Sequence, residues 1–306
     1  MNMITNTNKI TQKNKLGMSD RAFNILVISI VTIFMIIILY PVIFVVSASL
    51  SSARALTAGR VFLWPVEFNL KGYQMVLNNK LVLSGFANSV FFAFCGVVQH
   101  MFYTICAAYV LSRKDFKAKG FVMLLFLIPG WFSGGLIPQY IQYSSLGMTN
   151  NRWGYVFLAG FALGNVVIMR TYFQTSIPED LLEAGKMDGI SDLGYLLKIA
   201  IPLAKPVIAV ITLYYTVGNW NDYFGPMIYL RDQDLQTLQL ILRQILNASR
   251  VDASQLVNSS LAQEMAQQAE VMKYALIVIT ALPIIIIYPF IRKFFEKGVM
   301  VGSLKG

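Results

Sequence analysis

The side chains with the greatest chemical reactivity lie close together on one predicted helix. The single histidine, His100, falls between the two cysteines, Cys95 and Cys106. A helix places the two cysteine Cα atoms about 16 Å apart, which is too far for a disulfide between them. No carboxylate or second metal ligand lies near His100 in the sequence. The pattern therefore favours packing or a hydrogen bond between helices for His100, over metal or proton chemistry.

A second pattern, Gly185-Lys186, resembles the end of a phosphate-binding P-loop. The match fails, because Met187 replaces the hydroxyl residue and Asp180 stands where the first glycine should be. The sequence also has no nucleophile elbow and no HExxH zinc motif. We therefore expect a protein that is not an enzyme, with no metal site and no cofactor bound by this chain.

The composition places these residues in a membrane. Hydrophobic residues make up 56% of the 306 residues, charged residues only 13%, and the mean hydropathy is +0.59. A soluble domain carries about 25% charged residues. The apolar runs have the length that a helix needs to cross a bilayer. They predict an all-α membrane protein with six transmembrane helices, at about 23–48, 82–111, 121–143, 153–174, 199–219 and 272–292.

The first apolar run could be mistaken for a signal peptide. Its apolar core, 23–46, is longer than the core of a signal peptide, which has about 7 to 15 residues. We expect an uncleaved membrane anchor. All fifteen acidic residues fall in loops or at span edges, which disfavours ion-coupled transport because that chemistry uses ionisable groups at membrane depth.

Lysine and arginine concentrate in one set of connecting segments. They are frequent before the first span, in 113–119, in 186–198 and after the last span, and sparse in 49–81, 144–152 and 220–271. This asymmetry predicts that both termini are cytoplasmic. The net charge of +10 is then largely a topology signal, and no nucleic acid partner is expected. We expect a cytoplasmic tail over 1–20 and a single membrane domain over 21–306.

The link between the fourth and fifth predicted spans, about 176–198, has the pattern of a helical elbow. Ser176 and Glu179 have the spacing of a capping box, and Pro178 would lie in the first turn of the helix that the box starts. Gly189 suits the left-handed residue after that helix, and Ser191 can cap a second short helix. The small residues Ala184 and Gly185 would let another protein approach closely, although an ordinary amphipathic connector has a similar composition.

The spacing of this link resembles the EAA loop of ABC importer permeases. The sequence has Glu183-Ala184-Gly185, Gly189 after three residues, Ile199 after nine more, and Pro202. The family has alanine at 185 and leucine at 201. The resemblance implies a coupling helix that docks in a cleft of a cytoplasmic ATPase. The residues that it assigns to this contact are Leu181, Leu182, Glu183, Ala184, Gly185 and Gly189.

Further motifs resemble the maltose-type carbohydrate importers. WNDYFGP at 220–226 and the glycine-rich tail KGVMVGSLKG at 297–306 match their smaller six-span permease, and FSGGLIP at 132–138 with LGM at 146–148 resembles the subgroup for oligosaccharides derived from polysaccharides. The alternative is a permease for a polyamine or phosphonate, which would share the EAA loop but not the tail.

The resemblance also implies the surroundings of the chain. It implies a bacterial cell membrane, a second homologous permease, two copies of an ABC ATPase that holds the ATP and Mg²⁺, and an external or periplasmic sugar-binding protein. The substrate would be a carbohydrate, most simply an oligosaccharide.

Two groups of aromatic and amide side chains have the chemistry that binds sugars. Sugars stack on aromatic faces and hydrogen-bond to neutral polar groups. The first group ends the third predicted span and the second ends the fifth; they are Gln139, Tyr140, Tyr143, Asn219, Trp220, Asn221 and Tyr223. The alternative is the aromatic belt that membrane proteins carry at their interfaces.

The long segment at about 220–271 contains one amphipathic helix, because Leu235, Leu238, Ile241 or Leu242, and Ile245 recur at helical spacing. The family resemblance implies that this segment reaches the sugar-binding protein. A helix lying on the membrane surface is the alternative.

Overall fold

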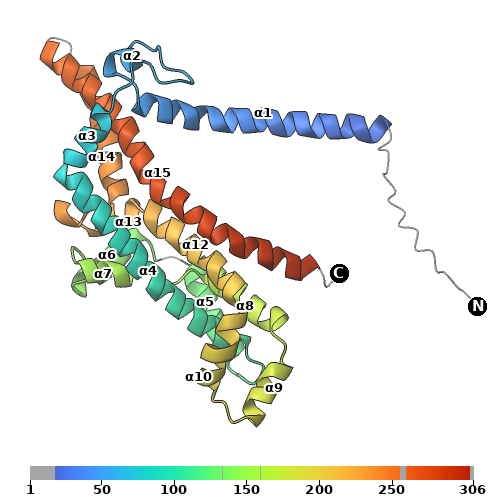
Figure 1. The fold of residues 1–306 in the computed structure, drawn as a ribbon. Coiled ribbons are helices and arrows are strands. Elements are labelled where there is room, and N and C mark those ends of the chain that lie inside the picture. Colours follow the sequence, from blue (N-terminus) through green and yellow to red (C-terminus); the bar gives the residue numbers. More distant parts are fainter. Residues whose placement is uncertain (1–17, 133, 159, 256–259, 304–306) are drawn as a thin grey trace, which may run out of the picture.

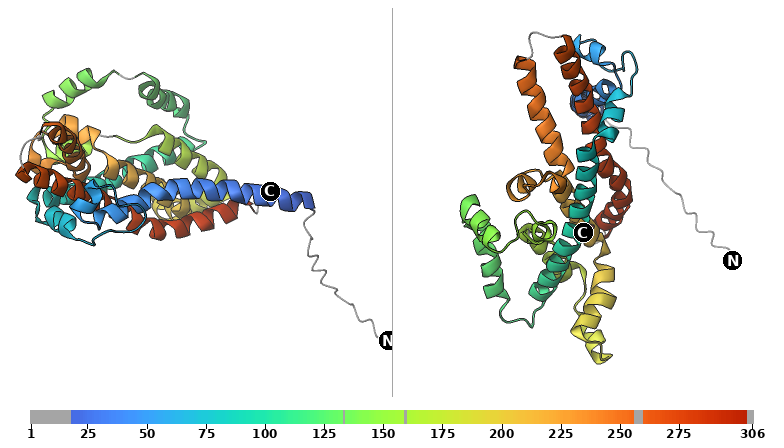
Figure 2. Two further views of the ribbon diagram at one scale, coloured as in Figure 1. Left: turned by 90° about the horizontal axis from the view of Figure 1, so that it is seen from above. Right: turned by 90° about the vertical axis from the view of Figure 1, so that its left-hand side faces the viewer.

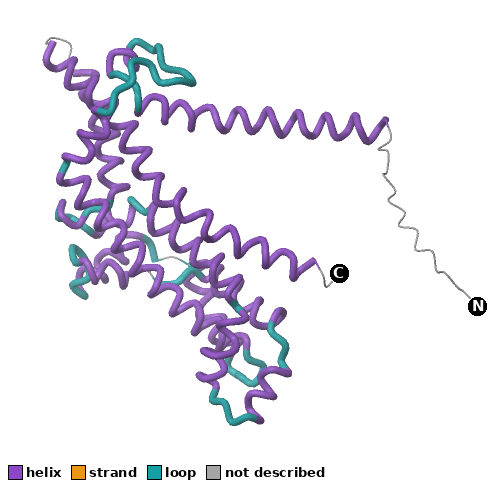
Figure 3. The backbone as a smooth tube through the Cα atoms, viewed as in Figure 1, coloured by secondary structure: helices purple, strands orange, loops and turns teal. Residues whose placement is uncertain are grey.

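The computed structural model describes residues 18–132, 134–158, 160–255 and 260–303, and the regular elements in these ranges are all helices (Figures 1 and 3). The first half contains α1 (Met18–Ser49), α2 (Ala53–Thr57), α3 (Lys71–Asn78), α4 (Lys80–Ser112), α5 (Lys119–Trp131), α6 (Leu136–Ser145) and α7 (Arg152–Leu158). The second half contains α8 (Leu163–Ser176), α9 (Asp180–Met187), α10 (Asp192–Tyr195), η1 (Leu196–Ala200), α11 (Ile201–Leu203), α12 (Lys205–Asn221), α13 (Phe224–Tyr229), η2 (Gln233–Leu235), α14 (Leu238–Gln255) and α15 (Ser260–Ser303). An all-helical fold is confirmed for these residues. Most of the predicted tail, 1–17, and the end of the glycine-rich tail, 304–306, lie outside them.

In the part of the chain that the structure describes, three helices are long and apolar enough to cross a membrane. They are Arg21–Ser49 within α1, Lys80–Ser112, which is α4, and Gln267–Pro289 within α15. These match the first, second and sixth predicted spans.

The third, fourth and fifth predicted spans are bent pairs of helices. The axes of α5 and α6 differ by 113°, those of α7 and α8 by 59°, and those of Asp192–Leu203 and α12 by 82°. The predicted spans 121–143, 153–174 and 199–219 therefore contain breaks between helices. Counting each bent pair as one span gives up to six spans in the described part of the chain.

Local sequence accounts for two of the bends. Gly135, just before α6, has a φ of 86°, a conformation that a side chain would disfavour. Pro206 lies in the first turn of α12, where its missing N–H needs no acceptor, so proline favours the start of a new helix there.

The bend between α7 and α8 is held by a side chain from α12. A chain that leaves the helical path loses backbone hydrogen bonds, which water cannot replace inside a membrane. The N–H of Ala162 donates instead to the hydroxyl of Tyr215 at 3.1 Å. The same hydroxyl lies 2.7 Å from Oγ1 of Thr104 in α4. The Tyr215 hydroxyl thus links α12 to α4 and to the bend between α7 and α8.

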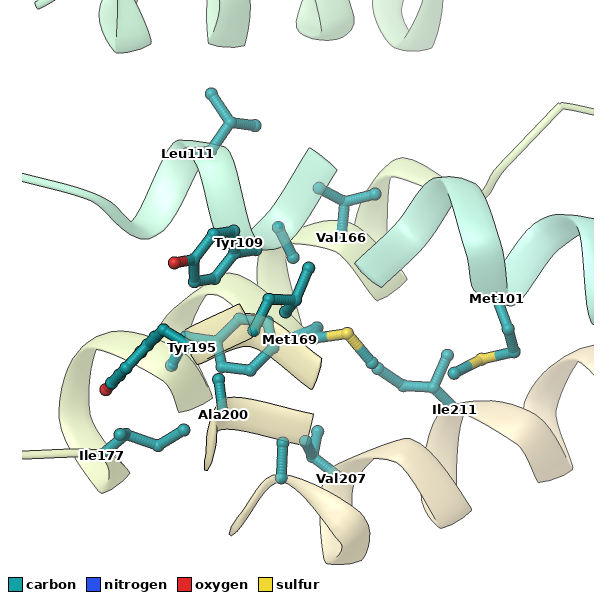
Figure 4. Close-up of a cluster of buried hydrophobic side chains, with 14 of the residues drawn as sticks. Met101, Tyr109, Leu111, Val166, Met169, Ile177, Tyr195, Ala200, Val207 and Ile211 are labelled. Carbon is teal, nitrogen blue, oxygen red and sulfur yellow. The ribbon is translucent and has the colours of Figure 1, made fainter. Parts of the chain in front are cut away.

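Helix α4 runs through the middle of the fold and packs against α8 and α12 (Figure 1). Figure 4 shows the apolar cluster at this junction, where Met101, Val166, Met169 and Ile211 meet and are all buried. Apolar side chains that leave both water and lipid at this junction fix the positions of the three helices.

A second apolar cluster joins α4, α14 and α15. Leu238, Ile241, Ala275 and Leu276 are buried in it. The amphipathic helix predicted in 220–271 therefore exists as α14. Over the first half of α14, the apolar face packs inside the chain, in the same cluster as Ala275 and Leu276 of α15.

Helix α1 stands apart from the rest of the fold (Figures 1 and 2). None of its most apolar window is buried within the chain. It is attached near its end, where Phe44 meets Tyr274 of α15 edge to face at 5.8 Å and Ser47 donates to the carbonyl of Leu63 at 2.7 Å. Its apolar surface is left for lipid or for another protein.

Candidate functional site

The link between α8 and α12 folds as a helical elbow built from α9, α10 and the turn between them. Gly189 has a φ of 71°, and Oγ of Ser191 accepts a hydrogen bond from the N–H of Gly194 at 3.1 Å. Both expectations are confirmed. The predicted capping role of Ser176 is wrong, because Ser176 ends α8 and α9 has no side-chain cap. Pro178 keeps Ile177 extended, so the chain breaks after Ser176 rather than before it.

The outer surface of the elbow carries Glu183 among exposed apolar side chains. Glu183 and Ala184 are exposed on α9, and Leu181, Met187 and Leu193 beside them are 39%, 89% and 65% exposed. Exposed apolar groups around a charge are typical of a protein-binding surface.

Gly185 and Leu182 face the inside of the elbow. Gly185 is buried, and a Cβ atom there would lie 3.4 Å from Cδ2 of Tyr195. The expectation that Gly185 leaves room for a partner is therefore wrong, because Tyr195 of the same chain occupies that room. Leu182 is half-buried and packs against the central apolar cluster.

Charged side chains attach the elbow to the end of α4. Lys114 pairs with Glu179, and Arg113 pairs with Asp192 at 3.3 Å. Arg113 also donates to Asp115, and this hydrogen bond holds the pKa of the Asp115 carboxyl below its usual value, with the charge of Arg113 adding to the effect. Sequence reasoning treated Arg113 and Lys114 only as a topology signal, because their partners are distant in the sequence.

A cavity of about 260 Å³ lies among α4, α6, α7, α12 and α13. Its wall is mostly apolar but contains amide, carboxylate and phenol groups, and we call it the polar cavity for these groups. The residues that line it are Phe92, Gly96, His100, Leu136, Gln139, Tyr143, Tyr155, Val156, Leu158, Asn219, Asp222, Phe224, Gly225, Tyr229 and Thr237. Gln139, Tyr143 and Asn219 of the predicted sugar path are brought together here, although Asn219 belongs to a helix that is distant in the sequence from the other two.

Hydrogen bonds fix the polar groups of this cavity. Gln139 donates from Nε2 to the hydroxyl of Tyr143 at 3.1 Å. On the other wall, the hydroxyl of Tyr155 donates to Oδ2 of Asp222 at 2.7 Å, and Oδ1 of Asp222 accepts from the N–H of Gly225 at 3.0 Å. Aromatic rings with oriented polar groups provide the chemistry that sugar hydroxyls and ring faces need.

Trp220 does not line the cavity, so its predicted place in the sugar path is wrong. Its side chain is only 4% exposed, its Nε1–H donates to the carbonyl of Thr280 at 2.9 Å, and its ring meets Phe86 edge to face at 5.8 Å. The predicted spans gave no indication that α15 would cover this indole.

Three other predicted path residues lie around the cavity rather than in its wall. The ring of Tyr140 stacks on Tyr229 with centroids 6.0 Å apart. Tyr223 lies under the guanidinium of Arg243, 4.1 Å from the ring centroid. Asn221 accepts a hydrogen bond from Gln239 at 3.3 Å.

Sequence reasoning missed Tyr155, Asp222 and Tyr229 as cavity residues. Asp222 had a signal, because it stands inside the WNDYFGP motif. Tyr155 had none, since an aromatic residue in an apolar run is ordinary.

His100 lines the cavity and packs against Tyr215, with ring centroids 4.9 Å apart. In the described ranges, no three His, Cys, Asp or Glu side chains are grouped so that they could hold a metal ion. Cys95 and Cys106 are free thiols.

An exposed elbow at one end of a long apolar helix, with a cavity further along that helix, is the arrangement expected of a transport subunit. Residues 10–301 match the family described as binding-protein-dependent transport system inner membrane components, and the chain belongs to that family.

Individual relatives match along almost the whole chain. Two are from Bacillus subtilis. Protein LplC is 34% identical over 270 residues, which cover 88% of this chain and 90% of that protein. The polygalacturonan/rhamnogalacturonan transport system permease protein YtcP is 34% identical over 292 residues, covering 94% of this chain and 100% of the relative. A chain in the crystal structure of a bacterial ABC transporter involved in the import of the acidic polysaccharide alginate has a TM-score of 0.82 and 35% identity, covering 91% of this chain and 98% of that one.

Proposed function

We infer that this chain is the permease subunit of an ATP-driven importer that moves an oligosaccharide across a bacterial cell membrane. The observation that carries the proposal is the pairing of two sites on one framework. The elbow offers Glu183 to a partner, and the cavity offers aromatic and amide groups to a sugar. The relatives named for polygalacturonan, rhamnogalacturonan and alginate support a polysaccharide-derived substrate.

The membrane arrangement that fits this role has six spans, three of them bent, with both termini cytoplasmic. Residues 21–306 then form one permease domain, with the coupling elbow over 176–198 and the external segment over 220–271. The basic residues Arg113, Lys114 and Lys186 all lie at the elbow, which supports a cytoplasmic position for it.

The partners follow from the two sites. An ATPase that holds ATP and Mg²⁺ docks on the exposed face of α9. The importer contains two copies of this ATPase, one bound to this chain and one bound to a second, homologous permease. An external binding protein delivers the sugar. The exposed apolar surface of α1 and the membership of the binding-protein-dependent family support an assembly of this kind.

The alternative substrates, a polyamine or a phosphonate, receive less support. Relatives named for arabinooligosaccharides and for melibiose, raffinose and stachyose match 72% and 80% of this chain. These names all describe carbohydrates.

Uptake by a strain lacking this chain tests the proposal. The strain is given labelled oligosaccharides from pectin, alginate, arabinan and neutral galactosides, together with a polyamine and a phosphonate. We expect the loss of uptake of at least one oligosaccharide, restored by the gene on a plasmid. Unchanged uptake of every sugar with loss of polyamine or phosphonate uptake would replace this function by the alternative.

A further inference from the structure

The end of α4 next to the elbow is contacted by α8, α9 and α10. This end is the segment 111–115, which we call the α4 joint. In α8, the Nε–H of Arg170 donates to the carbonyl of Leu111 at 3.1 Å, and Gln174 donates to the carbonyl of Ser112 at 3.4 Å. These carbonyls belong to the last turn of α4, where the helix itself supplies no donors. Helix α8 thus caps α4.

The elbow meets the α4 joint through charges. Arg113 binds Asp115 with two nitrogens, at 3.3 and 3.1 Å, and reaches Asp192 of α10 at 3.3 Å. The Arg113 side chain is 11% exposed, whereas the side chains of Asp115 and Asp192 are 60% and 72% exposed, so solvent screens part of each ion pair. The hydroxyl of Tyr109, one turn back in α4, donates to the backbone carbonyl of Asp192 at 3.2 Å.

Helix α9 is attached at both of its ends. Glu179, at its start, pairs with Lys114. Lys186, in its last turn, lies 3.6 Å from Asp115. The α4 joint therefore binds the beginning of α9, the end of α9 and the beginning of α10.

A cavity of about 170 Å³ lies between these charged contacts. Apolar side chains, including Phe173, Ile177 and Leu182, line it together with Arg113 and Lys114. Around this opening the elbow is held on α4 by the ion pairs and also by apolar contacts, because Tyr195 of α10 and Leu182 of α9 pack against the cluster that contains Tyr109.

The far part of α4 forms one wall of the polar cavity. Phe92, Gly96 and His100 of α4 line that cavity, and Gly96 lies about 25 Å along the helix from Arg113. A continuous helix moves as one body over this length, so a displacement at the joint changes the cavity wall.

We propose that the α4 joint transmits movement of the elbow to the cavity, with Arg113 as the positioning residue. The inference rests on the proposed function, because it takes the elbow as the place where the ATPase acts. Arg113 contacts neither the sugar nor the outer surface of α9. Its role is to keep α10 and the turn after α4 moving together.

The test uses the complete importer in proteoliposomes with its ATPase and binding protein. Arg113→Gln removes the charge, Arg113→Lys keeps it, and Lys117→Gln is the matched control. Lys117 belongs to the same loop, is exposed and makes no ion pair among the described residues. The measurements are subunit stoichiometry, basal ATP hydrolysis, and the sugar uptake per ATP hydrolysed.

We expect Arg113→Gln to keep the stoichiometry and basal hydrolysis but to lower the uptake per ATP by about fivefold or more, the usual size of coupling between sites. Arg113→Lys should keep part of the sugar uptake per ATP, and Lys117→Gln should have the wild-type uptake per ATP. Asp192→Asn combined with Arg113→Gln should cost little more than Arg113→Gln alone. Wild-type uptake per ATP in Arg113→Gln overturns the proposal, and so does a loss that only follows reduced assembly.

Glu183→Lys separates this result from failure of the proposed function. If Arg113→Gln is normal while Glu183→Lys releases the ATPase, the elbow docks the ATPase but the α4 joint does not transmit. If both variants are normal, the elbow is not the ATPase site, and the proposed function fails with the inference.

Discussion

Asn219 of α12 packs its amide against Gly96 of α4, at a point where a Cβ atom on Gly96 would lie 2.6 Å from Nδ2 of Asn219. Both residues line the polar cavity. The packing of the Asn219 amide against α4 beside the cavity thus requires a residue without a side chain at position 96.

The Gly96→Ala substitution is expected to impair transport. The added methyl group must push the Asn219 amide away, and overpacking of this kind typically costs about 1 to 3 kcal/mol. The measurement is the thermal stability of the purified complex together with its sugar uptake. Gly218→Ala is the control, since a Cβ there meets nothing within 4 Å. Equal uptake by the two variants would show that the Gly96 contact has no role in the cavity.

Replacing Trp220 by alanine is expected to lower the amount of folded protein. Loss of a buried tryptophan costs about 3 to 5 kcal/mol, and the carbonyl of Thr280 loses its donor. Trp220→Phe should cost less, about 1 kcal/mol for the hydrogen bond alone. Membrane yield and melting temperature measure both effects. A well-folded Trp220→Ala protein with reduced uptake would instead return this residue to the sugar path.

Removing the hydroxyl of Tyr155 tests the polar wall of the cavity. Tyr155→Phe leaves one oxygen of Asp222 without its 2.7 Å donor, a loss of about 1 kcal/mol or more. We expect weaker sugar-stimulated ATP hydrolysis at low sugar concentration. Asp222→Asn and the double variant complete a mutant cycle, and additive effects would contradict a functional pair.

Charge reversal at Glu183 is expected to disconnect the ATPase. A desolvated charge pair across an interface costs about 2 to 5 kcal/mol when one partner is removed, so association should weaken at least about tenfold. Asp188→Lys is the appropriate control, because Asp188 is exposed at the end of α9 and pairs with no cation in the described ranges. Asp192 is unsuitable as a control for charge reversal, because it forms an ion pair with Arg113. Association is measured by the ATPase retained on the purified permease pair.

Protonation of Glu67 is expected to remove a local contribution to stability. The hydrogen bond from Ser52 lowers the pKa of Glu67 in the folded chain, and Arg60 adds to the effect. A group with a lowered folded pKa stabilises the fold above its unfolded pKa, and this stabilisation is lost as the pH falls through the folded value. The difference in melting temperature between wild type and Glu67→Gln should therefore shrink below about pH 4.3. A difference that is constant from pH 7 to pH 3 would contradict this assignment.

The parts of the fold that follow from local sequence could be predicted. Gly189 and Ser191 act on their own turn, so their types were sufficient to predict their conformation and cap. The local pattern at Ser176 was equally good for a helix cap. However, Pro178 restricts the backbone of Ile177 to an extended conformation, so Ser176 becomes the last residue of α8. The bends at Gly135 and Ala204 were hidden inside runs that are apolar enough for one continuous span.

The residues that could not be predicted depend on contacts between distant parts of the chain. The sequence around Trp220 is the same whether its indole faces a cavity or packs against another helix. The structure shows that the indole packs against α15, because it donates a hydrogen bond to the carbonyl of Thr280, 60 residues further along the chain. Arg113 and Asp192 are 79 residues apart, and nothing in either neighbourhood indicates the other. Gln139, Tyr143 and Asn219 were identified by chemistry alone, and the cavity that unites them needed the packing of five helices.

The hydroxyl of Tyr215 limits which substitutions natural variation can explore at this position. Phenylalanine would keep the ring and its volume, yet it would leave the N–H of Ala162 without its acceptor inside the membrane. Thr104 would lose its hydroxyl partner as well. A lineage that replaces this tyrosine must therefore straighten the bend between α7 and α8, or acquire another acceptor there, in the same step.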